Sequence, residues 1–78
     1  MKEKIVASRD LSLVLAKKVA ETAAARNADL RILYRDKGAN AKSLMGVVAL
    51  AYKKGAELFL VAEGLEAKKA IDELKTLL

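Results

Sequence analysis

The sequence predicts a two-layer α+β domain in which a four-stranded sheet is covered by three helices. Segments with the two-residue period of strands and the 3.6-residue period of helices follow one another in the order β-α-β-β-α-β-α. Each helical segment carries one apolar stripe, so all three helices can cover the same face of the sheet. Because 78 residues leave room for only one hydrophobic core, we expect residues 1–78 to form a single domain.

The first strand and the first helix are predicted from the N-terminal third of the chain. Lys2–Ser8 contains three consecutive apolar residues, which is typical of a strand covered on both faces. Leu11–Arg26 repeats apolar residues every four positions, and Asp10 or Ser12 has a side chain that can cap its first turn. The predicted buried stripe of this helix consists of Leu11, Leu15, Val19 and Ala23.

A hairpin and the second helix are predicted from the middle of the chain. Asp29–Arg35 has one apolar face, and Asp36–Gly38 has the composition of a tight turn that leads to a short return strand at Ala39–Lys42. Ser43–Lys54 is predicted to be the second helix, and Gly55 suits the position that ends it.

The last strand and the third helix complete the predicted order. Ala56–Ala62 alternates between two faces, one of which consists of Leu58, Leu60 and Ala62. Leu65–Leu78 has the spacing of an amphipathic helix. Its predicted apolar stripe consists of Ala67, Ala70, Ile71, Leu74 and Leu77.

The residue types on which most enzymes and metal sites depend are missing. The chain has no histidine and no cysteine, so it lacks the commonest general base, the commonest metal ligand and any thiol. Its four glycines lie singly and form no phosphate-binding loop, and its carboxylates form no recognisable catalytic pair. We therefore expect a protein that is not an enzyme and that uses no metal or cofactor.

The net charge of +5 favours acidic partners through long-range electrostatic attraction. A basic nucleic-acid-binding module, or a structural α+β module, is the alternative interpretation. Binding of nucleic acid is disfavoured because the chain has only two tyrosines and one phenylalanine to stack on bases, and its lysines are spread along the sequence. No apolar run is long enough to span a membrane and no signal-peptide pattern is present, so we expect a cytoplasmic protein.

Ser43 stands where a predicted strand gives way to a predicted helix. A serine there can accept a hydrogen bond from a free backbone N–H group of the first helical turn. The same N–H groups and the positive end of the helix dipole also favour an anion. Ser43 is therefore either a plain helix cap or a place where a phosphoryl group can sit.

The element order and several stretches of sequence resemble HPr, the small phosphocarrier family of the bacterial sugar phosphotransferase system. The similarity covers nearly the whole chain and is densest in Asn40–Gly46, Lys54–Glu57 and Ala62–Gly64. It implies an open-faced β-sandwich, in which an antiparallel four-stranded sheet carries three helices on one face.

The resemblance breaks down at the phosphorylation motif of the family. Asp10–Ala16 replaces the motif Gly-Leu-His-Ala-Arg-Pro-Ala, and only Leu11 and Ala16 agree with it. Ser12 occupies the position of the phosphoryl-accepting histidine, and Val14 occupies that of the phosphate-binding arginine. A serine hydroxyl needs a neighbouring base for activation, and this chain has no histidine to provide one. We therefore expect that the protein does not relay phosphate from phosphoenolpyruvate.

The resemblance gives Ser43 a regulatory meaning as well. Ser43 matches the serine that an ATP-dependent kinase modifies in many members of the family, and the histidine-less relative Crh, a catabolite-repression protein, keeps only that site. The resemblance therefore implies a regulatory, protein-binding module whose partners are phosphotransferase-system or regulatory proteins, with a serine kinase acting on Ser43.

The family's docking face predicts one apolar surface. We expect this face to carry Leu13, Val14, Leu44, Met45 and Val48. Leu13 and Val14 either point inward and stabilise the start of the first helix, or remain exposed as anchors for a partner.

The open side of the sheet predicts a second apolar surface. The two-residue period of strands assigns Ile5, Leu30, Ile32, Leu58 and Leu60 to the helix side. It then assigns to the open side the large apolar residues Val6, Leu33, Phe59 and Val61. These residues predict a homodimer through that face, and the alternative is that they are ordinary scattered surface residues.

Overall fold

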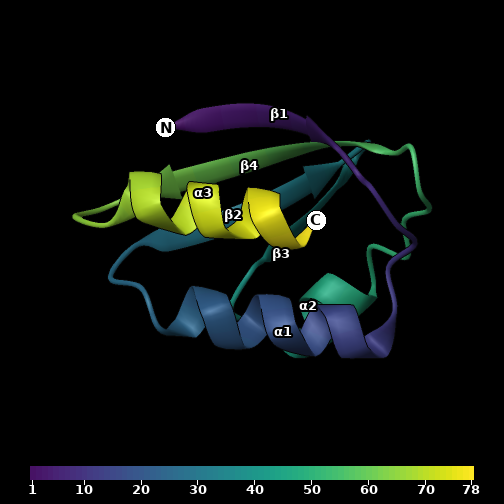
Figure 1. Cartoon of the computed structure of the whole chain (residues 1–78), viewed down its shortest axis with the longest axis horizontal. Coiled ribbons are helices and arrows are strands. Elements are labelled where there is room, and N and C mark those ends of the chain that lie inside the picture. Colours follow the sequence, from purple (N-terminus) through teal and green to yellow (C-terminus); the bar gives the residue numbers. More distant parts are fainter.

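The computed structural model describes residues 1–78 and contains four strands and three helices (Figure 1). The strands pair antiparallel in the order β1-β4-β2-β3, and all three helices lie on one side of the sheet. This arrangement confirms the predicted architecture. In chain order the elements are β1 (Lys2–Val6), α1 (Leu13–Ala24), β2 (Asp29–Tyr34), β3 (Lys37–Asn40), α2 (Leu44–Val48), β4 (Glu57–Glu63) and α3 (Ala67–Leu77).

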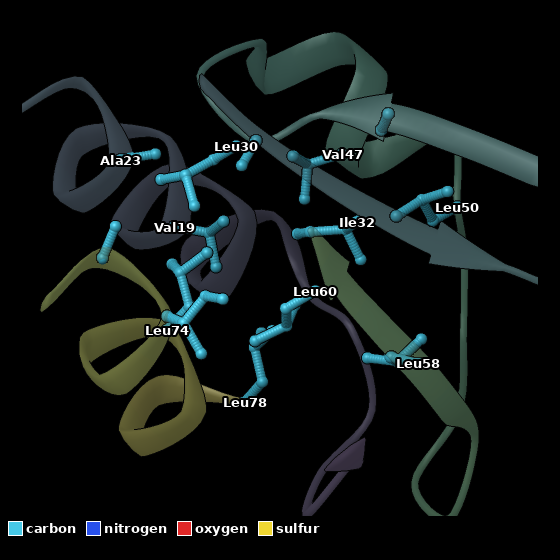
Figure 2. Close-up of a cluster of buried hydrophobic side chains, with 14 of the residues drawn as sticks. Val19, Ala23, Leu30, Ile32, Val47, Leu50, Leu58, Leu60, Leu74 and Leu78 are labelled. Carbon is cyan, nitrogen blue, oxygen red and sulfur yellow. The ribbon is translucent and has the colours of Figure 1, made fainter. Parts of the chain in front are cut away.

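The two central strands supply the sheet side of the core (Figure 2). Leu30 and Ile32 of β2 and Leu58 and Leu60 of β4 are buried, and Ile32 lies directly opposite Leu60. Their neighbours along each strand point to the open face, as the strand period predicts. The core consists of 20 buried residues, none of which is charged, and the hydroxyl of Tyr52 is its one polar side-chain group.

The helices complete the core with the predicted stripes. α1 buries Leu15, Val19 and Ala23, and α3 buries Ile71 and Leu74. α1 packs against both α2 and α3, and so it lies in the middle of the helical layer. None of the three helices has the length and apolar character needed to cross a bilayer.

The turn of the β2–β3 hairpin lies earlier than predicted. Arg35 and Asp36 form a two-residue turn, whereas Lys37 and Gly38 already belong to β3. Gly38 is not required by the turn, and a Cβ atom there would lie 2.7 Å from Nη2 at the flexible end of the Arg31 side chain, which would have to move aside. The left-handed backbone of the turn falls instead on Arg35, at φ 55°.

The prediction of a second helix that continues to Lys54 was wrong, because α2 ends at Val48. Leu50 and Tyr52 are both buried, and positions i and i+2 lie about 200° apart around a helix, so they cannot share one of its faces. The chain leaves the helix through Ala51, whose φ of 49° is left-handed, and both side chains then reach the core. Gly55 has a positive φ of 91°, but it lies in the loop before β4 and does not end a helix.

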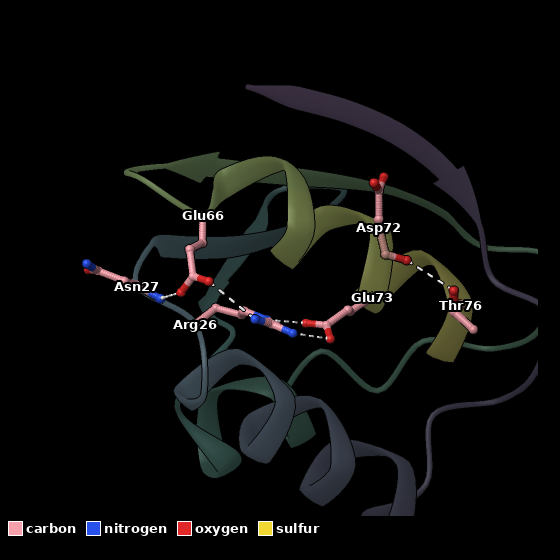
Figure 3. Close-up of polar contacts among 6 residues, drawn as sticks. All are labelled: Arg26, Asn27, Glu66, Asp72, Glu73 and Thr76. Atoms are coloured by element: carbon pink, nitrogen blue, oxygen red, sulfur yellow. Dashed lines mark hydrogen bonds and ion pairs between the residues drawn. The ribbon is translucent and has the colours of Figure 1, made fainter.

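A charged cluster ties the end of α1 to α3 (Figure 3). The guanidinium of Arg26 donates to both carboxylate oxygens of Glu73, at 2.6 and 2.7 Å, and to Oε2 of Glu66 at 3.3 Å. The other oxygen of Glu66 accepts the backbone N–H of Asn27 at 2.8 Å. The Asn27 bond lowers the pKa of Glu66, and the Arg26 bond lowers the pKa of Glu73.

This cluster predicts that acid weakens the packing of α3. Both glutamates have lower pKa values in the folded protein than their ordinary value of 4.5, so their contribution is fully present above that pH and is lost as the pH falls through the folded values. We expect the melting temperature of the wild type to drop more steeply below about pH 4.5 than that of Arg26→Met. Thermal melts recorded at several pH values by circular dichroism measure the difference.

Glu21→Gln provides the control, because Glu21 lies on α1 and makes no ion pair. Its acid profile should match that of the wild type. Parallel profiles for the wild type and Arg26→Met would contradict the assigned role of the cluster.

Candidate functional site

Ser12 caps the N-terminus of α1. Its backbone is extended, with φ −121° and ψ 166°, and its Oγ accepts a hydrogen bond from the N–H of Leu15 at 3.0 Å. The Ser12 carbonyl accepts from the N–H of Ala16 at 2.9 Å. Of the two predicted candidates, Ser12 is therefore the cap, and the carboxylate of Asp10 serves elsewhere.

The start of α1 is held against the loop that precedes β4. Oδ1 of Asp10 accepts the N–H of Lys54 at 2.7 Å, and the N–H of Leu11 donates to the carbonyl of Tyr52 at 3.0 Å. Ala7 continues the contact by donating to the carbonyl of Ala56 and accepting from Gly55, each at 2.9 Å. Two segments that are far apart in sequence are thus joined at the position of Ser12.

Tyr52 anchors this junction from inside the core. Its side chain is 1% exposed, its ring meets that of Tyr34 edge to face at a centroid distance of 6.3 Å, and its hydroxyl has no hydrogen-bond partner. Burial raises the pKa of Tyr52 to about 12, although the positive charge of Arg9 opposes the shift. The hydroxyl is therefore neutral at physiological pH and offers no base to Ser12.

Leu13 and Val14 remain exposed. Each side chain is 66% accessible, whereas the next two residues, Leu15 and Ala16, are buried in the core. Leu15 starts the stripe of α1 that faces the sheet. Leu13 and Val14 come before it in the chain, and the helical period places them on other sides of the helix. Of the two predicted arrangements, the structure has the exposed one.

Ser43 caps α2 as Ser12 caps α1. Its Oγ accepts the N–H of Gly46 at 3.1 Å, and its carbonyl accepts from Val47 at 3.0 Å. A Cβ atom on Gly46 would lie 3.2 Å from that Oγ, a tight contact that a shift of a few tenths of an ångström would relieve. The side chain of Asn40 accepts the N–H of Lys42 at 2.9 Å and fixes the approach to the cap.

The apolar residues of α2 divide between the core and the surface. Met45 is 74% exposed, whereas Leu44 and Val48 are partly buried against the core. Because α1 packs against α2, the starts of both helices belong to one layer of the molecule (Figure 1). We refer to Leu13, Val14 and Met45, the large apolar residues of these two helices that are mostly exposed, together as the exposed apolar patch.

The net charge of the protein is concentrated in the two segments that carry this patch. Residues 8–20 and 41–54 contain six of the 15 basic residues but only one of the ten acidic residues, so nine of each remain in the rest of the chain. Lys17 and Lys18 lie one helical turn after Leu13 and Val14 and therefore on the same sides of α1. Sequence analysis missed this segregation because it considered the basic residues without subtracting the acidic ones.

The residues predicted for the second surface all belong to the open face of the sheet. Val6 is 60% exposed and Phe59 is 36% exposed, whereas Leu33 and Val61 are partly buried. The ammonium group of Lys2 lies 4.8 Å from the centre of the Phe59 ring and covers part of it. The helix-side and open-side assignments are therefore confirmed.

Comparison with known families agrees with the fold. A family model described as the PTS HPr component phosphorylation site matches residues 2–78. The chain belongs to the HPr family. The phosphocarrier protein HPr of Mycoplasma capricolum subsp. capricolum is 35% identical over 57 residues, a match that covers 73% of this chain and 64% of that protein, under two-thirds of its length.

Two solved structures extend the comparison over the whole fold. HPr from Bacillus anthracis str. Ames superimposes with a TM-score of 0.92 and 28% identity, covering 100% of this chain and 95% of that one. The Bacillus subtilis protein Crh, described as a swapped, intertwined dimer, gives a TM-score of 0.80 and 27% identity, with 94% and 84% covered. This member of the HPr family therefore has the fold of both HPr and Crh, and its sequence contains no histidine.

The exposure of Leu13 generates a stability prediction with a matched control. Leu13→Ala removes a side chain that is largely in water, so we expect the free energy of unfolding to change by no more than about 0.5 kcal/mol. Leu15→Ala makes the same chemical change in the core and should cost roughly 2–5 kcal/mol. Urea unfolding followed by circular dichroism measures both, and equal losses would show that Leu13 is packed in solution.

Proposed function

We propose that this HPr-family chain is a protein-binding, regulatory module that does not carry a phosphoryl group from phosphoenolpyruvate and is not an enzyme. The observation that carries the proposal is the absence of histidine from the whole sequence, together with a serine at position 12 whose hydroxyl caps α1. Proteins of this fold that relay phosphate need a nucleophile of a kind that this chain lacks.

The chemistry of the two acceptors differs in a way that supports the proposal. A phosphorylated imidazole has a labile P–N bond and can pass its phosphoryl group on, whereas a serine phosphate is a stable ester. The Ser12 hydroxyl also needs a base for activation, and its hydrogen-bond partner is the N–H of Leu15, which is a donor. Val14 has no guanidinium to bind a phosphate in a bidentate way.

We infer that the exposed apolar patch, with Leu44 and Val48 at its base, forms the partner-binding face. Exposed aliphatic and methionine side chains are suitable anchors for a protein surface. The basic residues of the same two segments favour a partner whose docking surface is acidic, because opposite charges accelerate and orient the encounter. Phosphotransferase-system or regulatory proteins are the partners that family membership favours.

Nucleic acid is the weaker alternative for this basic region. Tyr34, Tyr52 and Phe59 are the only aromatic residues, and none of them lies in the exposed apolar patch. Tyr52 is buried and Phe59 belongs to the open face of the sheet, so neither can stack on a base bound beside Leu13.

Ser43 is the residue at which we propose that binding is switched by a serine kinase. A phosphate on its Oγ would lie at the free N–H groups of α2 and beside Lys42, an environment that tolerates added negative charge. The phosphate would also bring as many as two negative charges to a basic surface. It would therefore change which partner surfaces are electrostatically complementary to this one.

The first prediction from this proposal concerns phosphoryl transfer. Incubation with the general phosphotransferase enzyme and labelled phosphoenolpyruvate should leave the wild type unlabelled, because no residue can form a phosphoramidate on an imidazole. The double variant Ser12→His, Val14→Arg restores the two functional groups and should gain an acid-labile label. A labelled wild type would refute the proposal, and an unlabelled double variant would contradict the alignment of Ser12 with the family histidine.

The second prediction concerns Ser43. Treatment with the family's serine kinase and ATP should add one phosphate, detected by intact-protein mass spectrometry, because the Ser43 cap is at the surface of a short helix. Ser43→Ala should remain unmodified, whereas Ser12→Ala, which removes the other serine cap, should be modified like the wild type. A phosphate that persists in Ser43→Ala would reject this site.

A further inference from the structure

The open face of the sheet has no covering element and carries a central apolar strip. Phe59 lies at its middle, with Lys4 of β1 opposite it on one side and Leu33 of β2 on the other. Val61 continues the strip along β4, and Val6 extends it at the end of β1. Of these four apolar residues, Val6 is the most exposed at 60%.

The charged residues around this strip balance one another. Strand alternation places three cations and three carboxylates on the open face, so it has no net charge, whereas residues 8–20 and 41–54 hold the entire excess of +5. Two copies of a protein with this excess repel each other least when they meet through a neutral surface that is distant from the excess charge. The six residues are Lys2, Lys4, Arg31, Asp29, Glu57 and Glu63.

Part of this charge is left without a partner inside the chain. Lys4 pairs with Glu57 at 3.3 Å, but Arg31, Asp29 and Glu63 make no ion pair. Asp29 and Glu63 lie directly opposite each other on adjacent strands, an arrangement of like charges that is unfavourable alone. A surface with unpaired charges of both signs can be satisfied by a copy of itself.

Two shallow hollows flank the strip, so the open face is not flat. One, of about 390 Å³, is lined by residues that include Arg31, Val61 and Glu63. The other, also of about 390 Å³, lies at the opposite end of the strands and is lined by residues that include Tyr34, Glu57 and Phe59. A surface that has both projecting side chains and hollows can be complementary to a second copy of itself.

We propose that a second copy of this chain covers the open face and forms a two-fold symmetric, face-to-face dimer. Four strands of 4 to 7 residues, at about 3.4 Å per residue and about 4.8 Å apart, give a footprint of roughly 360 Å² per copy and a total buried area of roughly 720 Å². This area is below that of stable interfaces, so the dimer is weak and depends on protein concentration.

Sedimentation equilibrium from about 10 μM to about 1 mM tests the proposal with matched variants. The wild type should show a mass that rises from monomer toward dimer. Val6→Lys and Phe59→Ser should raise the dissociation constant at least about tenfold, because they place a charge or remove the largest side chain at the interface. Val14→Lys adds the same charge at a valine of similar exposure outside the sheet, and should change the constant less than about twofold.

Three results would overturn the proposal. The first is a wild type that remains monomeric over the whole range. The second is a Val14→Lys variant that weakens association as much as Val6→Lys does. The third is a dimer that persists undiminished in both sheet-face variants, which places the interface elsewhere. Thermal melts of each variant establish that a loss of association does not reflect unfolding.

Discussion

Burial of one face of the sheet beneath three helices is the constraint on which the other features of the molecule depend. The central strands contribute Leu30, Ile32, Leu58 and Leu60, and α1 lies over them between its two neighbouring helices. Because this core contains no charged group, every charged side chain lies outside it, on the helix surface, at the strand edges or on the open face. The exposed apolar patch and the open face of the sheet both lie outside this core.

The start of α1 is attached to the rest of the fold through residues that precede Ser12. The hydrogen bonds that join Asp10 and Leu11 to the loop before β4 do not depend on the residue at position 12, which needs only to cap the helix. Ser12 meets that need and leaves Leu13 and Val14 in solvent. The hydrogen bonds that attach this end of α1 to the fold therefore involve no reactive group at position 12.

Much of the fold was predictable from the sequence because the apolar periods of α1, α3, β2 and β4 are regular over whole elements. The end of α2 was not predictable in this way. Burial of both Leu50 and Tyr52 in the core is incompatible with a continuing helix, and no local sequence pattern marks this burial. The hairpin turn was misplaced because Gly38 was taken for a turn residue, although it belongs to β3. Periodicity alone could not decide the exposure of Leu13 and Val14, which depends on where the buried stripe begins.

The segregation of charge has a dynamic consequence. With its whole excess of positive charge in two segments at the helices and a neutral sheet on the other side, the molecule has an uneven potential around its surface. An acidic surface at a distance exerts a torque on such a molecule and turns its helices toward the approaching partner before any side chains touch. Added salt shortens the reach of that torque, so productive encounters become rarer even when the final contacts are unchanged.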